Sequence, residues 1–200
     1  MLVAIAVPFV LTVAVGKQKG IDKQAQAAQA EADEEAAKEA KLAEISKNVE
    51  SEREIKAYLN GKVIPLKEIG DGVFSEGMLG DGLAIKPKNE LVCAPVSGKI
   101  TMLIEDSKHA VSMTLSNGAE LLIHVGIDTV GMKGDGFEYL VKMGDIVKAG
   151  TPLITFNRDK IKAAGHPDTA IMLITNPNGV NFKFNSGMQA KSDKTIIATC

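Results

Sequence analysis

The dipeptide Asn117-Gly118 constrains the fold more than any other part of this sequence. It separates two segments of β-strand character, and both of its residues tolerate the positive φ angles that a type I′ turn requires. Asn-Gly between strands is typical of a two-residue hairpin loop. With these two residues as the loop, Ser116 pairs with Ala119, and this pair sets the register of an antiparallel hairpin.

The predicted register gathers two histidines and two other polar side chains on one face. His109 and His124 become diagonal neighbours, about 7 Å or less apart between their Cβ atoms, within reach of one bridging ligand. A shift of one residue would move His124 to the opposite face. The opposed pairs are Ser107 with Asp128, His109 with Gly126, and Val111 with His124.

Imidazole chemistry leaves two kinds of site open on this face. Near neutral pH a histidine can be a neutral metal ligand, a nucleophile or a proton donor. Combined with a hydroxyl and a carboxylate, the pair fits either a metal site or phosphoryl chemistry. For each histidine taken alone, an ordinary packed or polar strand position is the alternative.

The composition narrows the function classes. Of the 200 residues 45% are hydrophobic, which is enough for one packed domain with an extension. The formal net charge of -2 provides no basic field, so nucleic acid is not an expected partner. Aromatic residues make up only 4%, which leaves no platform for stacking sugar rings. The two cysteines show no metal or disulfide spacing, which indicates a reducing compartment, the cytosol.

Three segments differ in character along the chain. Residues 1–20 open with an apolar run that would span about 23 Å as a helix, less than the ~30 Å hydrocarbon core of a bilayer. We interpret it as the end of a transmembrane helix, with the following lysines on the cytoplasmic side, or as an apolar leader packed on the domain. Residues 21–60, rich in Ala, Glu and Lys, predict a long solvated helix that acts as a linker.

Residues 61–200 have the pattern of an all-β domain. Short apolar runs alternate with Gly, Pro and Asn at intervals of about eight to twelve residues. This spacing is typical of antiparallel sandwiches and barrels. We therefore predict an antiparallel β-sandwich or partly closed barrel, preceded by the long linker helix. Within this domain only residues 158–164 show a helical pattern.

An ordered set of segments gives this domain a family resemblance. The segments are VFSEGMLGDGLAIKP from Val73, APVSGKI from Ala94, SKHA from Ser107, GAELLIHVGIDTV from Gly118, KGDGF from Lys133 and GDIVKAGTPLITF from Gly144. The set resembles the glucose-type enzyme IIA domain of the bacterial phosphoenolpyruvate-dependent sugar phosphotransferase system. This resemblance implies a β-sandwich of the duplicated hybrid motif type, a histidine phosphocarrier, and a position as the C-terminal part of a multidomain sugar permease.

The resemblance also implies roles for the polar face of the hairpin. His124 would take a phosphoryl group from the phosphocarrier protein HPr and pass it to a cysteine of enzyme IIB. His109 would support the phosphoryl group, and Ser107 would orient the two rings. Asp128 would lie near the reacting ring or cap the following turn. This scheme needs no metal and no cofactor.

An apolar rim for partner docking is implied as well, at Val73, Phe74, Leu79 and Val130, whose alternative is ordinary core packing. Gly126 would leave space for the phosphoryl group. Glu105 departs from the family, because an aromatic residue is usual there. The domain would be cytoplasmic, with a possible tether to a IIC membrane domain at the inner face of the cell membrane.

Three rival functions are weighed against this one. A zinc peptidase of related fold needs a second histidine two residues after the first, and Gly126 occupies that position after His124. A swinging-arm carrier needs methionine on both sides of its lysine, and Val141 precedes Lys142. A regulatory protein-binding module is compatible with the same resemblance.

Overall fold

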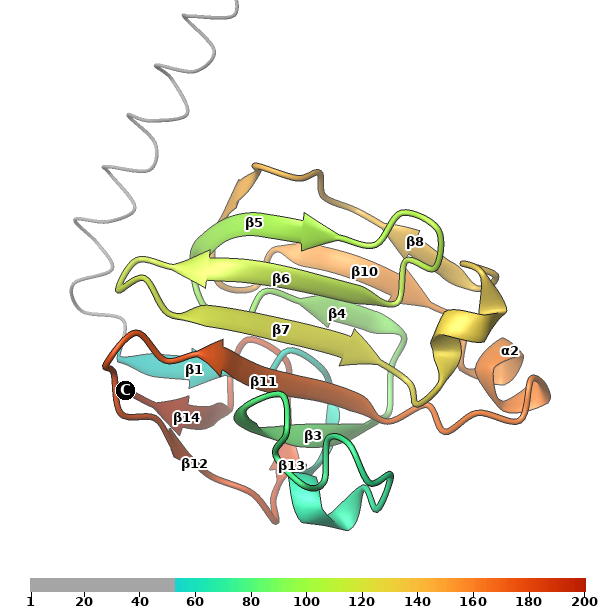
Figure 1. Ribbon diagram of the computed structural model, residues 1–200, viewed down its shortest axis with the longest axis horizontal. Helices are drawn as coiled ribbons and strands as arrows, with labels where there is room; N and C mark the ends of the chain where they lie inside the picture. The colour runs from blue at the N-terminus through green and yellow to red at the C-terminus, as the bar shows by residue number, and fades with distance from the viewer. Residues whose placement is uncertain (1–52) are drawn as a thin grey trace, which may run out of the picture. The chain divides into compact units, whose positions relative to one another are not determined.

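The computed structural model describes residues 53–200 (Figure 1). The predicted apolar segment 1–20 and nearly all of the predicted helical linker 21–60 lie outside these residues. Within the described range, none of the helices has the length and apolar character that a bilayer crossing requires.

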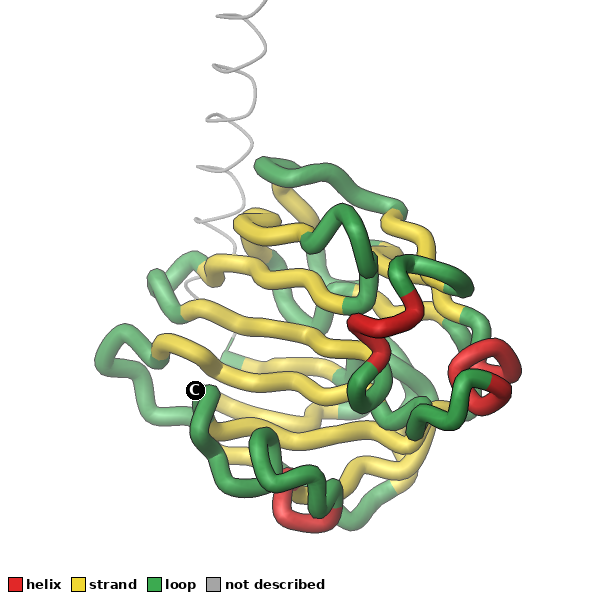
Figure 2. Tube along the Cα trace, turned by 45° about the vertical axis from the view of Figure 1, so that its right-hand side comes forward, coloured by secondary structure: helices red, strands yellow, loops and turns green. Residues whose placement is uncertain are grey.

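The described residues form short strands joined by turns, with little helix. Figure 2 shows the helical segments confined to connections between strands. The strands are β1 (Glu54–Lys56), β2 (Gly61–Pro65), β3 (Asp81–Pro87), β4 (Leu91–Cys93), β5 (Gly98–Leu103), β6 (Ala110–Leu115), β7 (Glu120–Val125), β8 (Phe137–Tyr139), β9 (Ile146–Val147), β10 (Pro152–Phe156), β11 (Ala170–Asn176), β12 (Lys183–Phe184), β13 (Gln189–Ala190) and β14 (Ile196–Thr199). The helical segments are the 3-10 turns η1 (Leu66–Glu68) and η2 (Thr129–Met132) and the helix α2 (Arg158–Ala163).

The strands are arranged in three antiparallel sheets. The largest has the order β13-β2-β3-β11-β7-β6-β5-β9, and the smaller ones are β4-β10-β8 and β1-β14-β12. In Figure 1, β4 and β10 lie behind β5, β6 and β7. These sheets confirm the predicted all-β antiparallel class, and α2 confirms the single helical pattern expected near residues 158–164.

The main core fills the space between the layers. On β6 and β7 alternate residues point into it, and Leu121, Ile123 and Val125 of β7 are fully buried. Burial of each such side chain stabilises the fold by about 1.5–3 kcal/mol. The intervening residue His124 therefore points to the other face of the large sheet.

Residues 54–60 differ from the predicted linker helix. They form strand β1 and a turn, and Ile55, Tyr58 and Leu59 are buried in the core. The Tyr58 hydroxyl donates to the carbonyl of Ala170 over 2.9 Å. Core burial and pairing with β14 override the helical propensity of this stretch, so the β domain begins before residue 61.

A second apolar cluster covers the outer face of the large sheet. It includes Ile64, Phe74, Ile127, Ile171 and Leu173, and Leu122 of β7 packs against it. The segment between β2 and β3, which carries η1 and Phe74, passes in front of β3 in Figure 1. This cluster fixes the loop of residues 70–80 on the same face as His124.

Candidate functional site

The hairpin that carries His124 has a three-residue loop, so the predicted two-residue loop is wrong. The backbone N–H of Leu115 donates to the carbonyl of Ala119 over 2.9 Å, and that of Gly118, with φ of 79°, donates to the carbonyl of Leu115 over 3.0 Å. His124 is therefore opposite Ala110, not Val111. An Asn-Gly pair fits both loop lengths, because a three-residue loop also needs a residue with positive φ at its end.

The two histidine rings nevertheless meet. Their centroids lie 4.5 Å apart, and the ring planes are inclined by 79°, edge to face. Strand β6 begins only at Ala110, and Lys108 before it has a φ of 51°. His109 consequently lies outside the pleated strand, and the alternation that would have sent it to the core face does not apply to it.

The ring of His124 has a fixed proton position. Its Nδ1 lies 2.9 Å from the carbonyl oxygen of Gly126. Because a carbonyl can only accept, Nδ1 must carry the hydrogen of this bond. In the neutral imidazole the lone pair is then on Nε2, which leaves that nitrogen as the nucleophilic atom.

Electrostatics keep His124 neutral at physiological pH. Burial, and to a smaller extent the neighbouring His109, lower the pKa of His124 to about 4, although Gly126, Asp128 and Asp71 act in the opposite direction. Burial also lowers the pKa of His109. Both rings are therefore uncharged near pH 7, the state in which an imidazole nitrogen can attack.

The lowered pKa predicts a loss of stability in acid. Unfolded His124 binds a proton near its ordinary pKa of about 6.5, but the folded protein resists doing so until about pH 4. The free energy of unfolding should fall by about 2–3 kcal/mol between these pH values through His124. Urea unfolding from pH 7.5 to 4.5 checks this: His124→Gln should show a shallower pH dependence, and equal slopes in both proteins would contradict it.

His109 is held by its own set of contacts. Its Nδ1 lies 2.7 Å from the Ser107 hydroxyl, and both side chains are buried. The Tyr139 hydroxyl donates to the carbonyl of Ala110 and accepts from the backbone N–H of Ile104 over 2.9 Å. Tyr139 thus ties both ends of the turn that carries Ser107 and His109.

Two carboxylates act on His124 at a distance. Asp128 has a left-handed φ of 57° and makes no side-chain hydrogen bond at the start of η2, which does not support the capping alternative. Asp71 accepts backbone N–H groups of Val73, Phe74 and Ser75. Partial burial opposes ionisation of Asp71, but these bonds outweigh it and lower its pKa. Asp71 was not among the predicted site residues, although an Asp-Gly pair such as residues 71–72 is a turn signal.

The residues of the expected rim divide into two kinds. Phe74 is only 8% exposed and packs its ring 5.0 Å from that of His124. Val73, Leu79 and Val130 are 45%, 47% and 61% exposed, so these three side chains are not part of the core. Met78, which was not predicted, is also exposed.

Gly126 is required by its own backbone environment. Its φ is 80°, and a Cβ atom there would lie 2.3 Å from Cγ2 of Thr129. The predicted pairing of Gly126 with His109 is wrong, because the backbone N–H of Val125 donates to the carbonyl of His109 over 2.7 Å and that of Gly126 donates to the carbonyl of Thr169. Space for Thr129 and a left-handed backbone therefore account for this glycine.

Comparisons with known proteins bear on this arrangement. Residues 53–180 match the family of the phosphoenolpyruvate-dependent sugar phosphotransferase system, EIIA 1. The chain belongs to this family. The glucose permease IIA from Mycoplasma capricolum is 35% identical, with a TM-score of 0.67, over 72% of this chain and 94% of that one. Helicobacter pylori Csd3 is 15% identical in two crystal forms. The orthorhombic form aligns with a TM-score of 0.31 over 55% of this chain and 28% of that one. The hexagonal form aligns with a TM-score of 0.35 over 70% of this chain and 35% of that one.

The chain therefore contains an EIIA phosphocarrier domain, a phosphotransferase component of the sugar phosphotransferase system. This confirms the function predicted from the ordered segments around the two histidines. Within residues 53–200, no three His, Cys, Asp or Glu side chains are grouped so that they could hold a metal ion. The EIIA family implies partners from the same phosphotransferase system.

Proposed function

We propose that His124 of this EIIA domain carries the phosphoryl group on Nε2. The observation that carries the proposal is the bond from Nδ1 of His124 to the carbonyl of Gly126, which leaves the lone pair on Nε2. The low pKa of His124 supports it, because an imidazolium has no lone pair to offer.

The transfer then needs no proton movement on His124. As the bond between phosphorus and the phosphohistidine nitrogen of HPr breaks, a new N–P bond forms at Nε2. Nδ1 keeps its hydrogen and its bond to Gly126 throughout. In the second step a cysteine thiolate of enzyme IIB attacks phosphorus, the S–P bond forms, and His124 leaves as a neutral ring. Phosphoryl transfer depends mainly on such alignment and on charge stabilisation.

His109 and Ser107 are proposed to assist through a shared tautomer. If the Ser107 hydroxyl donates to Nδ1 of His109, the ring proton of His109 lies on Nε2. That N–H can donate to a phosphoryl oxygen on the neighbouring His124. The edge-to-face arrangement of the two rings is compatible with this bond.

His109→Gln should slow transfer onward to enzyme IIB by about tenfold to a hundredfold, because one donor to the charged oxygens is lost or displaced. Labelling of His124 by HPr should persist. Rapid-quench measurement of phosphate loss to IIB checks this, with Ser107→Ala as a milder companion. Undiminished transfer would contradict the role of His109.

Asp128 is proposed to tune the phosphorylated state. Its charge acts on His124, and a carboxylate near a phosphoryl group disfavours accumulation of negative charge. Asp71 acts in the same sense. Both would favour passing the group on rather than storing it.

The exposed apolar residues Val73, Leu79 and Val130 are proposed to contact HPr and enzyme IIB. Such residues in an interface exclude water from the reacting group and limit hydrolysis. Phe74 would support the ring of His124 from behind. Glu105, which is exposed, would add a negative charge at the edge of this surface.

We also propose a cellular setting. The domain would be cytoplasmic, with a duplicated hybrid sandwich fold, and the part of the predicted linker that precedes β1 would join it to a IIC membrane domain of a sugar permease. Residues 1–20 would be the end of its last transmembrane helix.

The test uses phosphoenolpyruvate, enzyme I and HPr with the full chain. Acid-labile label should appear on one histidine, and mapping of the phosphohistidine isomer should give the Nε2 form at His124. A folded protein that takes up no label, or carries it on His109 or on Nδ1, would overturn the proposal.

A further inference from the structure

The peptide unit between Gly126 and Ile127 is held from both sides. Its carbonyl accepts the Nδ1 hydrogen of His124, and its N–H, on Ile127, donates to the carbonyl of Pro167 over 3.0 Å. In a planar trans peptide these two groups point in opposite directions. The position of the Pro167 carbonyl therefore sets the direction in which the acceptor of His124 points.

The segment 167–169 makes a second bond to the same place. The backbone N–H of Gly126 donates to the carbonyl of Thr169 over 3.0 Å. The carbonyls of Pro167 and Thr169 thus hold Gly126 and Ile127 from two adjacent positions. Asp168, whose side chain is 17% exposed, lies between them in the sequence.

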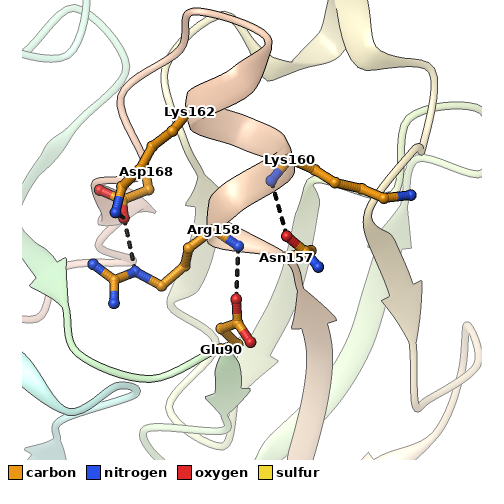
Figure 3. Close-up of polar contacts among 6 residues, drawn as sticks. All are labelled: Glu90, Asn157, Arg158, Lys160, Lys162 and Asp168. Atoms are coloured by element: carbon orange, nitrogen blue, oxygen red, sulfur yellow. Dashed lines mark hydrogen bonds and ion pairs between the residues drawn. The ribbon is translucent and has the colours of Figure 1, made fainter.

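Helix α2 anchors Asp168. Nε of Arg158 lies 2.8 Å and Nζ of Lys162 3.5 Å from the same carboxylate oxygen, and Figure 3 shows both side chains reaching from α2 to Asp168. Arg158 is itself fixed, because its backbone N–H donates to the carboxylate of Glu90 over 2.8 Å. Asn157 caps the helix by accepting from the N–H of Lys160.

We propose that Asp168, anchored by Arg158, is a positioning residue for His124. The ion pair between Asp168 and Arg158 fixes the segment 167–169. This segment orients the Gly126–Ile127 peptide, whose carbonyl keeps the proton of His124 on Nδ1. The proposal rests on the proposed role of His124 as the phosphoryl acceptor. An amide whose N–H is engaged is a stronger acceptor at its carbonyl, which increases the preference for this tautomer.

Loss of the Asp168 charge should change the tautomer of the His124 ring, although the two side chains are not in contact. Asp168→Asn removes the partner of both Arg158 and Lys162, so the segment 167–169 gains freedom. His124 should then populate both neutral tautomers. The rate of phosphoryl acceptance should fall by about fivefold to tenfold, because a displaced reacting atom is costly even when all catalytic groups remain.

The experiment reads the tautomer directly in the unphosphorylated full chain. The ¹⁵N chemical shifts of Nδ1 and Nε2 of His124, measured through couplings to the ring protons, distinguish the two forms. We expect Nδ1–H alone in the wild type, a mixture in Asp168→Asn, a smaller change in Arg158→Gln because Lys162 remains, and recovery in Asp168→Glu. Backbone spectra confirm that each variant is folded.

The neighbouring ion pair of Lys160 with Asp135 supplies matched controls. Lys160 lies on the same helix and Asp135 in the turn before β8; both side chains are largely exposed, and neither bonds to Pro167 or Thr169. Lys160→Gln and Asp135→Asn should leave the tautomer and the labelling rate unchanged. An unaltered tautomer in both folded Asp168→Asn and Arg158→Gln would overturn the positioning role, whereas absence of label in the wild type would overturn the proposed function instead.

Discussion

His124→Gln is expected to remain folded and to accept phosphoryl groups from HPr at least about a thousandfold more slowly than the wild type. The glutamine amide can still donate a hydrogen bond toward the Gly126 carbonyl, and it approximates the volume of the ring. Its nitrogen, however, has no lone pair available for attack. The measurement is the initial rate of label transfer from phosphorylated HPr.

The third histidine supplies the control for this experiment. His166 lies in the loop after α2 and has no place in the two-ring arrangement. His166→Gln should be labelled at the wild-type rate, and the label should still map to His124. Labelling of folded His124→Gln at a comparable rate would show that another residue is the acceptor.

Gly126→Ala is expected to lower the free energy of unfolding by about 2–4 kcal/mol. One part of this cost comes from the φ of 80°, which a residue with a Cβ atom adopts poorly. The other part comes from the methyl of Thr129, 2.3 Å from the added atom, and from the nearby carbonyl of Pro167. Chemical denaturation of the variant and the wild type gives the difference.

A second substitution separates the two parts. Thr129→Ser removes the clashing methyl and keeps the hydroxyl that donates to the carbonyl of Val125 over 2.7 Å. The double variant should recover the steric part and retain a loss of about 1–2 kcal/mol from the backbone alone. A Gly126→Ala protein as stable as the wild type would mean that Gly126 is needed for ligand space rather than for the fold.

The hairpin illustrates how far the sequence could be interpreted. The pair Asn117-Gly118 correctly predicts where the chain turns, and the two histidines do meet. The loop length was wrong, because the dipeptide fits either turn type and the choice involves tertiary contacts. One of these is the side-chain amide of Asn178, which donates to the carbonyl of Asn117 over 2.8 Å. The residues around the turn do not predict a contact with Asn178, which lies about 60 residues further along the chain.

Other differences have the same origin in long-range contacts. Residues 54–60 have a composition that fits a helix, yet the first three of them form β1, which pairs with β14, more than 130 residues further along the chain. Phe74 and Asp71 come together with His124 only because an apolar cluster holds their loop on the outer face of the sheet. The antiparallel class, by contrast, follows from the regular spacing of turn residues, which is local information.

The partner of Nδ1 on His124 belongs to the main chain, and this affects how the site tolerates genetic variation. A side-chain acceptor can be deleted by a single codon change, but every residue contributes a carbonyl, so no substitution at position 126 removes this one. Only changes that move the backbone can disturb it, and under the proposed positioning role such changes would act from Asp168 and its ion pair with Arg158. Variants that impair the choice of reacting nitrogen should therefore map outside the histidine pair.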